Sequence, residues 1–110
     1  MGYAQLAEGR VERVEVPGFR WEGRPFGHNT PSHGVAFTAD EKEVWVNDGV
    51  SGYIHVFDNT VSPPKQVASI AVREEPGWVT FSLDGRFAYP STGDVIDVAT
   101  RKIVTSLTDE

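Results

Sequence analysis

The sequence contains no cysteine, which excludes disulfide bonds and thiolate metal sites and leaves the redox compartment undetermined. It has no apolar run near the roughly 20 residues that a helix needs to cross a bilayer, so we predict no membrane span. Basic residues are few, with 10 Lys and Arg against 16 Asp and Glu, and the net charge of −6 argues against a nucleic-acid partner. The first ten residues lack a basic start and an apolar core, so we predict no signal peptide. These absences favour a soluble protein of undetermined compartment, and export of a longer parent protein stays open.

The composition that remains favours strands and turns over helices. At 110 residues the chain is one domain or less. It is rich in glycine and proline, with 11 and 7 residues, and its larger apolar residues are mainly Val, Phe, Ile, Trp and Tyr. Branched and aromatic residues suit a pleated sheet, and Gly and Pro suit the turns between strands.

Two segments, 32–46 and 76–90, repeat one pattern 44 residues apart. Each copy alternates apolar and polar residues on both sides of a turn, which predicts a β-hairpin. A repeat of about 40 to 50 residues is typical of β-propeller blades. The equivalent pairs are Val35 and Val79, Phe37 and Phe81, Thr38 and Ser82, Asp40 and Asp84, Lys42 and Arg86, and Trp45 and Tyr89.

The turn between the two strands differs between the copies. The second copy has Asp84-Gly85, a sequence typical of a tight hairpin turn. The first copy has Asp40-Glu41 instead, which lacks the glycine that such a turn prefers. We therefore predict a different or longer turn in the first copy.

The repeat continues downstream, where "KQVASI" at 65–70 matches "KIVTSL" at 102–107. Four strands are expected in each copy, and four short antiparallel strands form one propeller blade. We predict an all-β fold with two consecutive four-stranded antiparallel blades, at 32–72 and 73–110. The expected strands are 33–38, 43–47, 53–58 and 65–72, then 77–82, 86–90, 94–98 and 101–107.

A third, partial copy lies at the N-terminus, where "RVERVEV" at 10–16 matches "QVASIAV" at 66–72. We interpret 1–16 as the outer strands of a preceding blade.

The predicted fold has no helix longer than two turns within 32–107. It buries both the Val35/Phe37 face and the Val79/Phe81 face between blades.

The two copies resemble the repeats of the YVTN-type β-propellers, relatives of the lactonase-like and quinoprotein-like propellers. The resemblance rests on "SHGVAFT" at 32–38 and "VTFSLDGR" at 79–86. The chain departs from the family pattern at 45–48, "WVND", and at Pro90, which follows Tyr89. The resemblance implies an architecture and no particular activity, because propellers carry many functions. A closed propeller has about four blades or more. The resemblance therefore implies that the chain is part of a longer protein, which we favour, or that it self-associates.

The link into the first predicted inner strand is about a dozen residues longer than the link between the two blades, and the extra residues form a loop at 17–31. The resemblance places such links on the face around the central channel, where propellers bind ligands. Three aromatic and two arginine residues within 19–26 suit a planar or anionic ligand or a protein partner. The alternative is a loop that packs its aromatic residues on the blade beneath. The candidate ligand-binding residues are Arg20, Trp21, Arg24, His28, His33 and Trp78.

Histidines near this loop raise the question of a metal. His28 and His33, with Asp48 or Glu75 as a third group, would offer ligands for zinc or iron. Nothing in their spacing requires a metal, and we predict none. The segment 47–52 has oxygen ligands at alternating positions but lacks the spacing of an EF-hand loop, so we expect a flexible loop.

Three other polar residues have structural explanations. Asp58 and Asp97 each end a predicted third strand, and we expect their side chains to bond the backbone of the following turn. His55 alternates with Ile54 and Val56, so we expect it to face outward or between blades.

The sequence contains no P-loop, dinucleotide fingerprint or nucleophile elbow, and we predict no cofactor. The leading hypothesis is a binding or scaffold segment of a propeller. Its partners would be missing blades or a second copy, together with a small-molecule or protein ligand. The alternative is a fragment of a propeller enzyme, lactonase-like or redox-linked, completed by missing blades. The resemblance implies that a lactonase would need a metal on the channel face, and that a haem-linked propeller would need a Cys-x-x-Cys-His motif, which this chain lacks.

Overall fold

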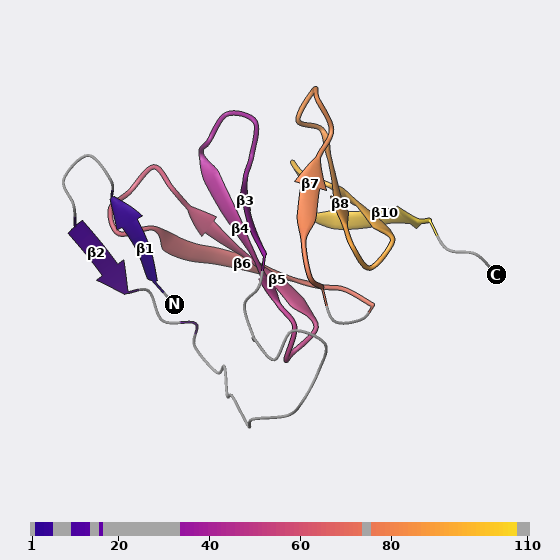
Figure 1. Ribbon diagram of the computed structural model, residues 1–110. Helices are drawn as coiled ribbons and strands as arrows, with labels where there is room; N and C mark the ends of the chain where they lie inside the picture. Colours follow the sequence, from indigo (N-terminus) through magenta and orange to yellow (C-terminus); the bar gives the residue numbers. More distant parts are fainter. Residues whose placement is uncertain (1, 6–9, 14–15, 17–33, 74–75, 108–110) are drawn as a thin grey trace.

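The computed structural model describes residues 2–5, 10–13, 16, 34–73 and 76–107 (Figure 1). These residues form ten β-strands and the turns between them, with no helix in the part of the chain that is described. The all-β prediction is confirmed. Accordingly, no helix in the described segments is long and apolar enough to cross a membrane.

The strands form two four-stranded antiparallel sheets and one hairpin. The first sheet has the order β3-β4-β5-β6, and the second has the order β7-β8-β9-β10. The hairpin β1-β2 pairs Gly2 with Arg13. Every strand of the two sheets overlaps one of the predicted ranges. The strands are β1 Gly2–Gln5, β2 Arg10–Arg13, β3 Val35–Phe37, β4 Glu43–Asp48, β5 Tyr53–Asp58, β6 Lys65–Ala71, β7 Val79–Phe81, β8 Phe87–Pro90, β9 Asp94–Asp97 and β10 Lys102–Ser106.

The core lies between the two sheets. In the first sheet Ala36 pairs with Trp45, and Trp45 pairs with Val56, so these residues share one face. Trp45 is fully buried and meets the ring of Phe81 edge-on, with 5.2 Å between the ring centroids. This edge-to-face geometry is favoured by aromatic rings and adds to the apolar burial. The core residues are Trp45, Ile54, Val56 and Ile70 of the first sheet and Val79, Ala88 and Ile96 of the second.

The prediction that both Val-x-Phe faces would be buried is wrong for the first copy. Val79 is buried, and Phe81 packs against Trp45. Val35 and Phe37, in contrast, are 65% and 53% exposed. Side chains alternate across a strand, and the first sheet turns its Ala36 face toward the second sheet. Val35 and Phe37 therefore point to the opposite side, away from the core.

The prediction of a different turn in the first copy is also wrong, because both copies form the same turn. Glu41 N–H donates to the Thr38 carbonyl at 2.8 Å, as Gly85 N–H donates to the Ser82 carbonyl at 2.9 Å. Glu41 has a φ of 60°, close to the 73° of Gly85. The side chains of Thr38 and Asp40 hold this shape: Thr38 Oγ1 donates to Asp40 Oδ1, which also accepts from Lys42 N–H. The second copy repeats these bonds.

These turns give a first test. An L-residue with a side chain is strained in the left-handed conformation by about 1 kcal/mol. Glu41→Gly should therefore stabilise the chain by up to about 1 kcal/mol, less the greater flexibility of glycine in the unfolded state. Gly85→Ala should destabilise it by about 1–2 kcal/mol, because a Cβ there is strained and would lie 3.1 Å from the Ala39 Cβ. Urea unfolding measures both, and a loss of stability in both variants would contradict the equivalence of the turns.

Candidate functional site

The two sheets approach most closely where their first strands begin. Gly34 precedes β3, and Gly77 and Trp78 precede β7. A Cβ placed on Gly34 would lie within 3.0 Å of three atoms, the Asn47 amide nitrogen, the Gly77 carbonyl oxygen and the Trp78 Cα. Only glycine fits this approach, and the absence of a side chain there lets β3 and β7 converge.

Trp78 is the one candidate ligand-binding residue that the structure describes, and it lies at this junction. Its backbone is fixed: the Trp78 carbonyl accepts from Ser91 N–H at 2.9 Å, and Ser91 Oγ accepts from Gly77 N–H. Its side chain, however, is 55% exposed. A large aromatic side chain on a fixed backbone, half in solvent, offers contact area at little cost in entropy.

Asn47 lies beside Trp78 at the same junction and was missed by sequence reasoning. It is on β4 and fully buried, and within the part of the chain that the structure describes its amide nitrogen and oxygen both lack a hydrogen-bond partner. Leaving a buried amide unpaired costs about 1–3 kcal/mol, so such groups point to a partner outside the chain or to ordered water. The signal in the sequence was a polar residue at the position two after Trp45, on the apolar face of the strand.

The remaining site predictions fall outside the described residues. Arg20, Trp21, Arg24, His28 and His33 are among these, and they stay predictions. Asp48, considered above as a metal ligand, is described and has other partners. Within the described ranges no group of three His, Cys, Asp or Glu side chains is placed to hold a metal ion.

His55 is the centre of a polar network on β4, β5 and β6, in which His55 and Asp48 are buried and Ser69 is exposed. Its Nε2 lies 2.8 Å from Asp48 Oδ2, and its Nδ1 lies 2.8 Å from Ser69 Oγ. The carboxylate accepts, so Nε2 carries the proton in the neutral ring, and Nδ1 accepts from Ser69 or from the Gln66 amide. Tyr53 stacks on the imidazole. The prediction that His55 faces outward or between blades is refined: it faces away from the second sheet, and it is buried.

The second sheet has the same network with other side chains. Asp94 accepts from Thr92 and from Ser106, at 2.8 and 3.0 Å. Asp94 pairs directly with Ser106 across the sheet, as His55 pairs with Ser69. Asp94 therefore stands where His55 stands in the first sheet. In each sheet this side chain connects the turn between the second and third strands to the outermost strand. The network is structural, although its serine, histidine and aspartate are the residue types of a hydrolytic triad.

Asp48 links this network to its own turn. Its Oδ1 accepts from the N–H groups of Val50 and Ser51, and the Gly52 N–H bonds its carbonyl. The segment 47–52 is therefore a hydrogen-bonded turn, where a flexible loop was predicted. Burial raises the pKa of Asp48, but the bonds from His55, Ser51 and Val50 together outweigh burial and hold the pKa below its usual 3.8.

This lowered pKa predicts acid sensitivity. Because the folded-state pKa lies below the unfolded one, Asp48 stabilises the fold fully above pH 3.8 and loses that contribution as the pH falls through the folded pKa. Asp48→Asn should cost about 2–3 kcal/mol at pH 5, the scale of bonds to a charged group. The difference from wild type should shrink at pH 2.5. Urea unfolding at both values measures it, and a difference that stays constant would contradict an ionised Asp48.

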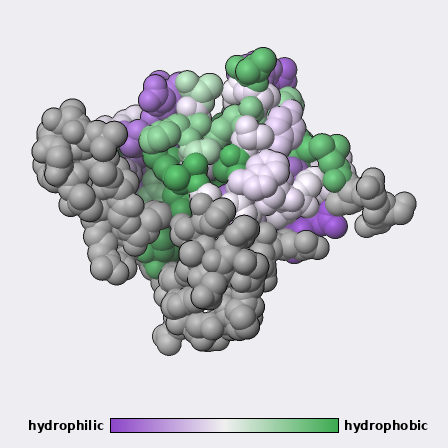
Figure 2. All heavy atoms as spheres, in the orientation of Figure 1, coloured by the Kyte–Doolittle hydropathy of each residue, from purple (hydrophilic) through white to green (hydrophobic). Residues whose placement is uncertain are grey.

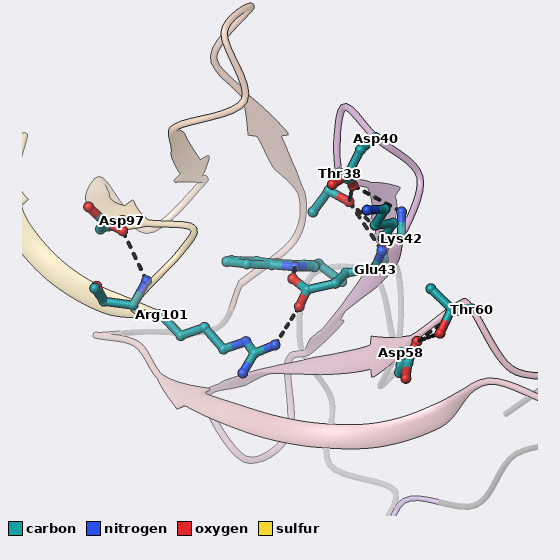
Figure 3. Close-up of polar contacts among 10 residues, drawn as sticks. Thr38, Asp40, Lys42, Glu43, Asp58, Thr60, Asp97 and Arg101 are labelled. Carbon is teal, nitrogen blue, oxygen red and sulfur yellow. Dashed lines mark hydrogen bonds and ion pairs between the residues drawn. The ribbon is translucent and has the colours of Figure 1, made fainter.

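A groove lies at the opposite end of the sheets from Trp78. The turns 38–42, 82–86 and 97–101 line it, and its volume is about 510 Å³. The carboxylates of its aspartates, Asp40, Asp84 and Asp97, are engaged in their own turns, as predicted for Asp97, which accepts from Thr100 N–H. Asp58, outside the groove, accepts from Thr60 N–H in the same way (Figure 3).

An ion pair crosses from sheet to sheet beside this groove. Arg101, in the turn before β10, bonds the carboxylate of Glu43 at the start of β4 (Figure 3). Glu43 also accepts from Trp45 Nε1 at 3.0 Å, so the same carboxylate ties the core indole to the second sheet. Glu43, which lines the groove, therefore helps to hold the two sheets together. We place the candidate site at the other end, around Trp78 and Asn47.

Comparisons with known proteins agree on the fold. The sequence matches no protein-family model, and no curated protein matches it. The structure is similar to hydrazine synthase from Kuenenia stuttgartiensis, with a TM-score of 0.73 and 20% identity over 99% of this chain and 30% of that one. It is also similar to a proposed 6-phosphogluconolactonase from Bacteroides uniformis, with a TM-score of 0.60 and 24% identity over 72% of this chain and 26% of that one.

Both of these proteins have propeller-type folds, and the chain spans less than a third of the length of either. At these identities the likeness shows the fold alone. The two four-stranded sheets are thus propeller blades. The resemblance to the YVTN-type family is supported only as far as this fold.

Proposed function

We propose that the chain is the binding segment of a larger β-propeller, and that a small molecule or a protein contacts it where β3 and β7 begin. The observation that carries this proposal is the unpartnered, fully buried amide of Asn47 beside the half-exposed Trp78. A ligand at this junction would supply hydrogen bonds to the amide and stack on the indole. Sites of this kind combine aromatic surface with a few fixed polar groups.

The loop 17–31 completes the proposed site. Arg20 and Arg24 would contribute positive charge in a chain whose net charge is −6, and Trp21 would add a second aromatic surface. His28 and His33 follow in the sequence, and His33 directly precedes Gly34. The arginines favour an anionic group on the ligand, and the tryptophans favour a planar one.

The proposal also assigns the rest of the chain. Residues 32–72 and 73–110 are two consecutive blades, 17–31 is an inserted loop, and 1–16 are the outer strands of a preceding blade. Val35 and Phe37 have exposed apolar side chains, and we expect a further blade to pack on them.

The site can be tested with a planar anionic probe, naphthalene-2-carboxylate, followed by amide and indole NMR shifts. Shifts should concentrate at Trp78, Asn47 and the amides of 17–33. Trp21→Ala and Arg24→Ala should each weaken binding about tenfold, the loss expected for one aromatic or charged contact of about 1.4 kcal/mol. Both should leave the free energy of unfolding within about 1 kcal/mol, as for surface residues.

Two outcomes would contradict the site. Shifts that concentrate in the groove near Thr38 and Asp84 would place binding at the wrong end of the sheets. A loss of several kcal/mol of stability in Trp21→Ala would identify 17–31 as a packing element, on the scale of a lost core aromatic residue.

A second candidate is a fragment of a propeller enzyme, favoured by the likeness to a proposed 6-phosphogluconolactonase. A lactonase in this chain would use the same end of the sheets, with His28 and His33 as the groups able to hold a metal or move a proton. Incubation with 6-phosphogluconolactone in a pH-stat, with and without zinc, tests it. Acid release above the spontaneous rate that His33→Ala abolishes would support an enzyme, and an unchanged rate would exclude this substrate.

A further inference from the structure

The first sheet has an incompletely covered face. On the side away from the second sheet, Val46 and Phe57 are buried, but Val35 and Phe37 on the edge strand β3 are exposed. Figure 2 shows apolar surface gathered over the first sheet. The most exposed apolar side chains of this face are Val35 and Phe37, in alternate positions on the innermost strand, and Tyr53 on β5 is 38% exposed.

The interface between the two sheets shows what fits such a face. Val79 and Phe81 stand 44 residues after Val35 and Phe37 and occupy the same positions on β7. Phe81 is covered by Trp45, whose directly paired neighbour in the sheet is Ala36. A partner that covers Val35 and Phe37 in the same way would therefore be a pair of antiparallel strands, with a small residue on one strand paired with an aromatic residue on the other.

The size of the partner follows from β1 and β2. The outer pair of the first sheet begins at Gly52-Tyr53, and β1 begins with the same pair, Gly2-Tyr3. Like β5 and β6, β1 and β2 form an antiparallel pair, so they correspond to the outer half of a blade. Among the described residues no strand pairs with the other edge of β1, so they do not form the inner half of such a blade, the half that would cover Val35 and Phe37. This step rests on the proposed assignment of 1–16 to a preceding blade.

We infer that Val35 and Phe37 form the docking site of a two-stranded β-hairpin, from polypeptide outside these 110 residues, that carries an aromatic residue paired with a small one. The hairpin adds by backbone hydrogen bonds to the edge of β1 that no described strand occupies, and it covers Phe37 with its aromatic ring. We favour a hairpin over a second copy of this chain, because a second copy would bring a complete four-stranded sheet, whereas in the proposed assignment β1 and β2 already supply the outer pair.

The chain itself supplies the probe. Residues 34–51, which contain β3, β4 and the following turn, can be grafted directly before Gly2, so that the copy runs into Gly2-Tyr3 as the original runs into Gly52-Tyr53. Covalent attachment gives a high effective concentration, so weak docking becomes measurable. The full 110-residue chain is retained in every variant.

The graft should raise the midpoint of urea unfolding by about 1 M, as expected for the burial of one or two apolar side chains. It should also reduce the fluorescence of anilinonaphthalene sulfonate bound to exposed apolar surface. Both effects should disappear when the copied tryptophan in the graft is replaced by alanine. They should also disappear with Phe37→Ser in the chain, a substitution that is tolerated because Phe37 is 53% exposed.

Three outcomes would overturn the inference: no change on grafting, an equal change with the alanine graft, or self-association of the ungrafted chain that Phe37→Ser abolishes. The last would identify a second copy as the occupant. Naphthalene-2-carboxylate binding at Trp78 serves as the separate readout. If it persists in the graft while docking fails, only the hairpin is rejected, and if it fails while docking holds, only the binding site is rejected.

Discussion

Replacing Trp45 by alanine should lower the free energy of unfolding by about 3–5 kcal/mol, the cost of removing a buried aromatic side chain. Trp45 is fully buried, packs edge-on against Phe81 and donates to Glu43, so its loss leaves a cavity and removes one of the two bonds to that carboxylate, which keeps Arg101 as a partner. A small domain has about 5–15 kcal/mol in total, so this variant should be largely unfolded or much weakened.

Trp78→Ala is the matched control, because it removes the same side chain from the adjacent blade. Trp78 is 55% exposed and should cost about 1 kcal/mol or less. Urea unfolding followed by circular dichroism measures both variants. Equal losses for the two tryptophans would show that the core does not lie between the sheets.

Gly34→Ala should be as damaging as a core truncation, although it adds only one methyl group. The new Cβ would lie within 3.0 Å of the Gly77 carbonyl oxygen and the Trp78 Cα, which are backbone atoms that cannot rotate away. Overpacking of this kind costs about 1–3 kcal/mol or more, and we expect the upper end because two sheets must separate.

Gly77→Ala provides the control on the facing strand. Among the described residues, a Cβ there would contact Ser91 Oγ, at 3.7 Å, which is an ordinary contact. Its effect should be about 0.5 kcal/mol or less, as for other unstrained surface changes. The comparison uses thermal unfolding of the two variants side by side. If Gly77→Ala proves the more harmful, the convergence of β3 and β7 is misplaced.

The fold was predictable from the sequence because its signals are local and repeated. Alternation placed the strands, and the 44-residue repeat grouped them into two sheets. The turn at Asp40-Glu41 was missed because the glycine preference was weighed alone. The bonds that Thr38 and Asp40 make to the turn hold Glu41 in a conformation that it would otherwise avoid.

The site was predictable only in part. Trp78 was named because it lies among the first residues of the predicted inner strand 77–82, and the structure places it at the junction of the sheets, half exposed. Asn47 was missed because its burial depends on Gly34, Gly77 and Trp78, which meet only in the folded chain. The exposure of Phe37 was missed for a similar reason: alternation identifies two faces of a strand but does not say which face a neighbouring sheet will cover.

The most direct test of this account is whether the two sheets pack face to face through Trp45 and Phe81. Nuclear Overhauser effects measured on the labelled chain report this contact in solution. The account predicts cross-peaks between the Trp45 indole and the Phe81 ring, whose centroids are 5.2 Å apart, together with cross-peaks between Ala36 and Trp45 within the first sheet. Cross-peaks within each sheet but none between Trp45 and Phe81 would contradict it, because the chain would then form two separate sheets and not consecutive propeller blades.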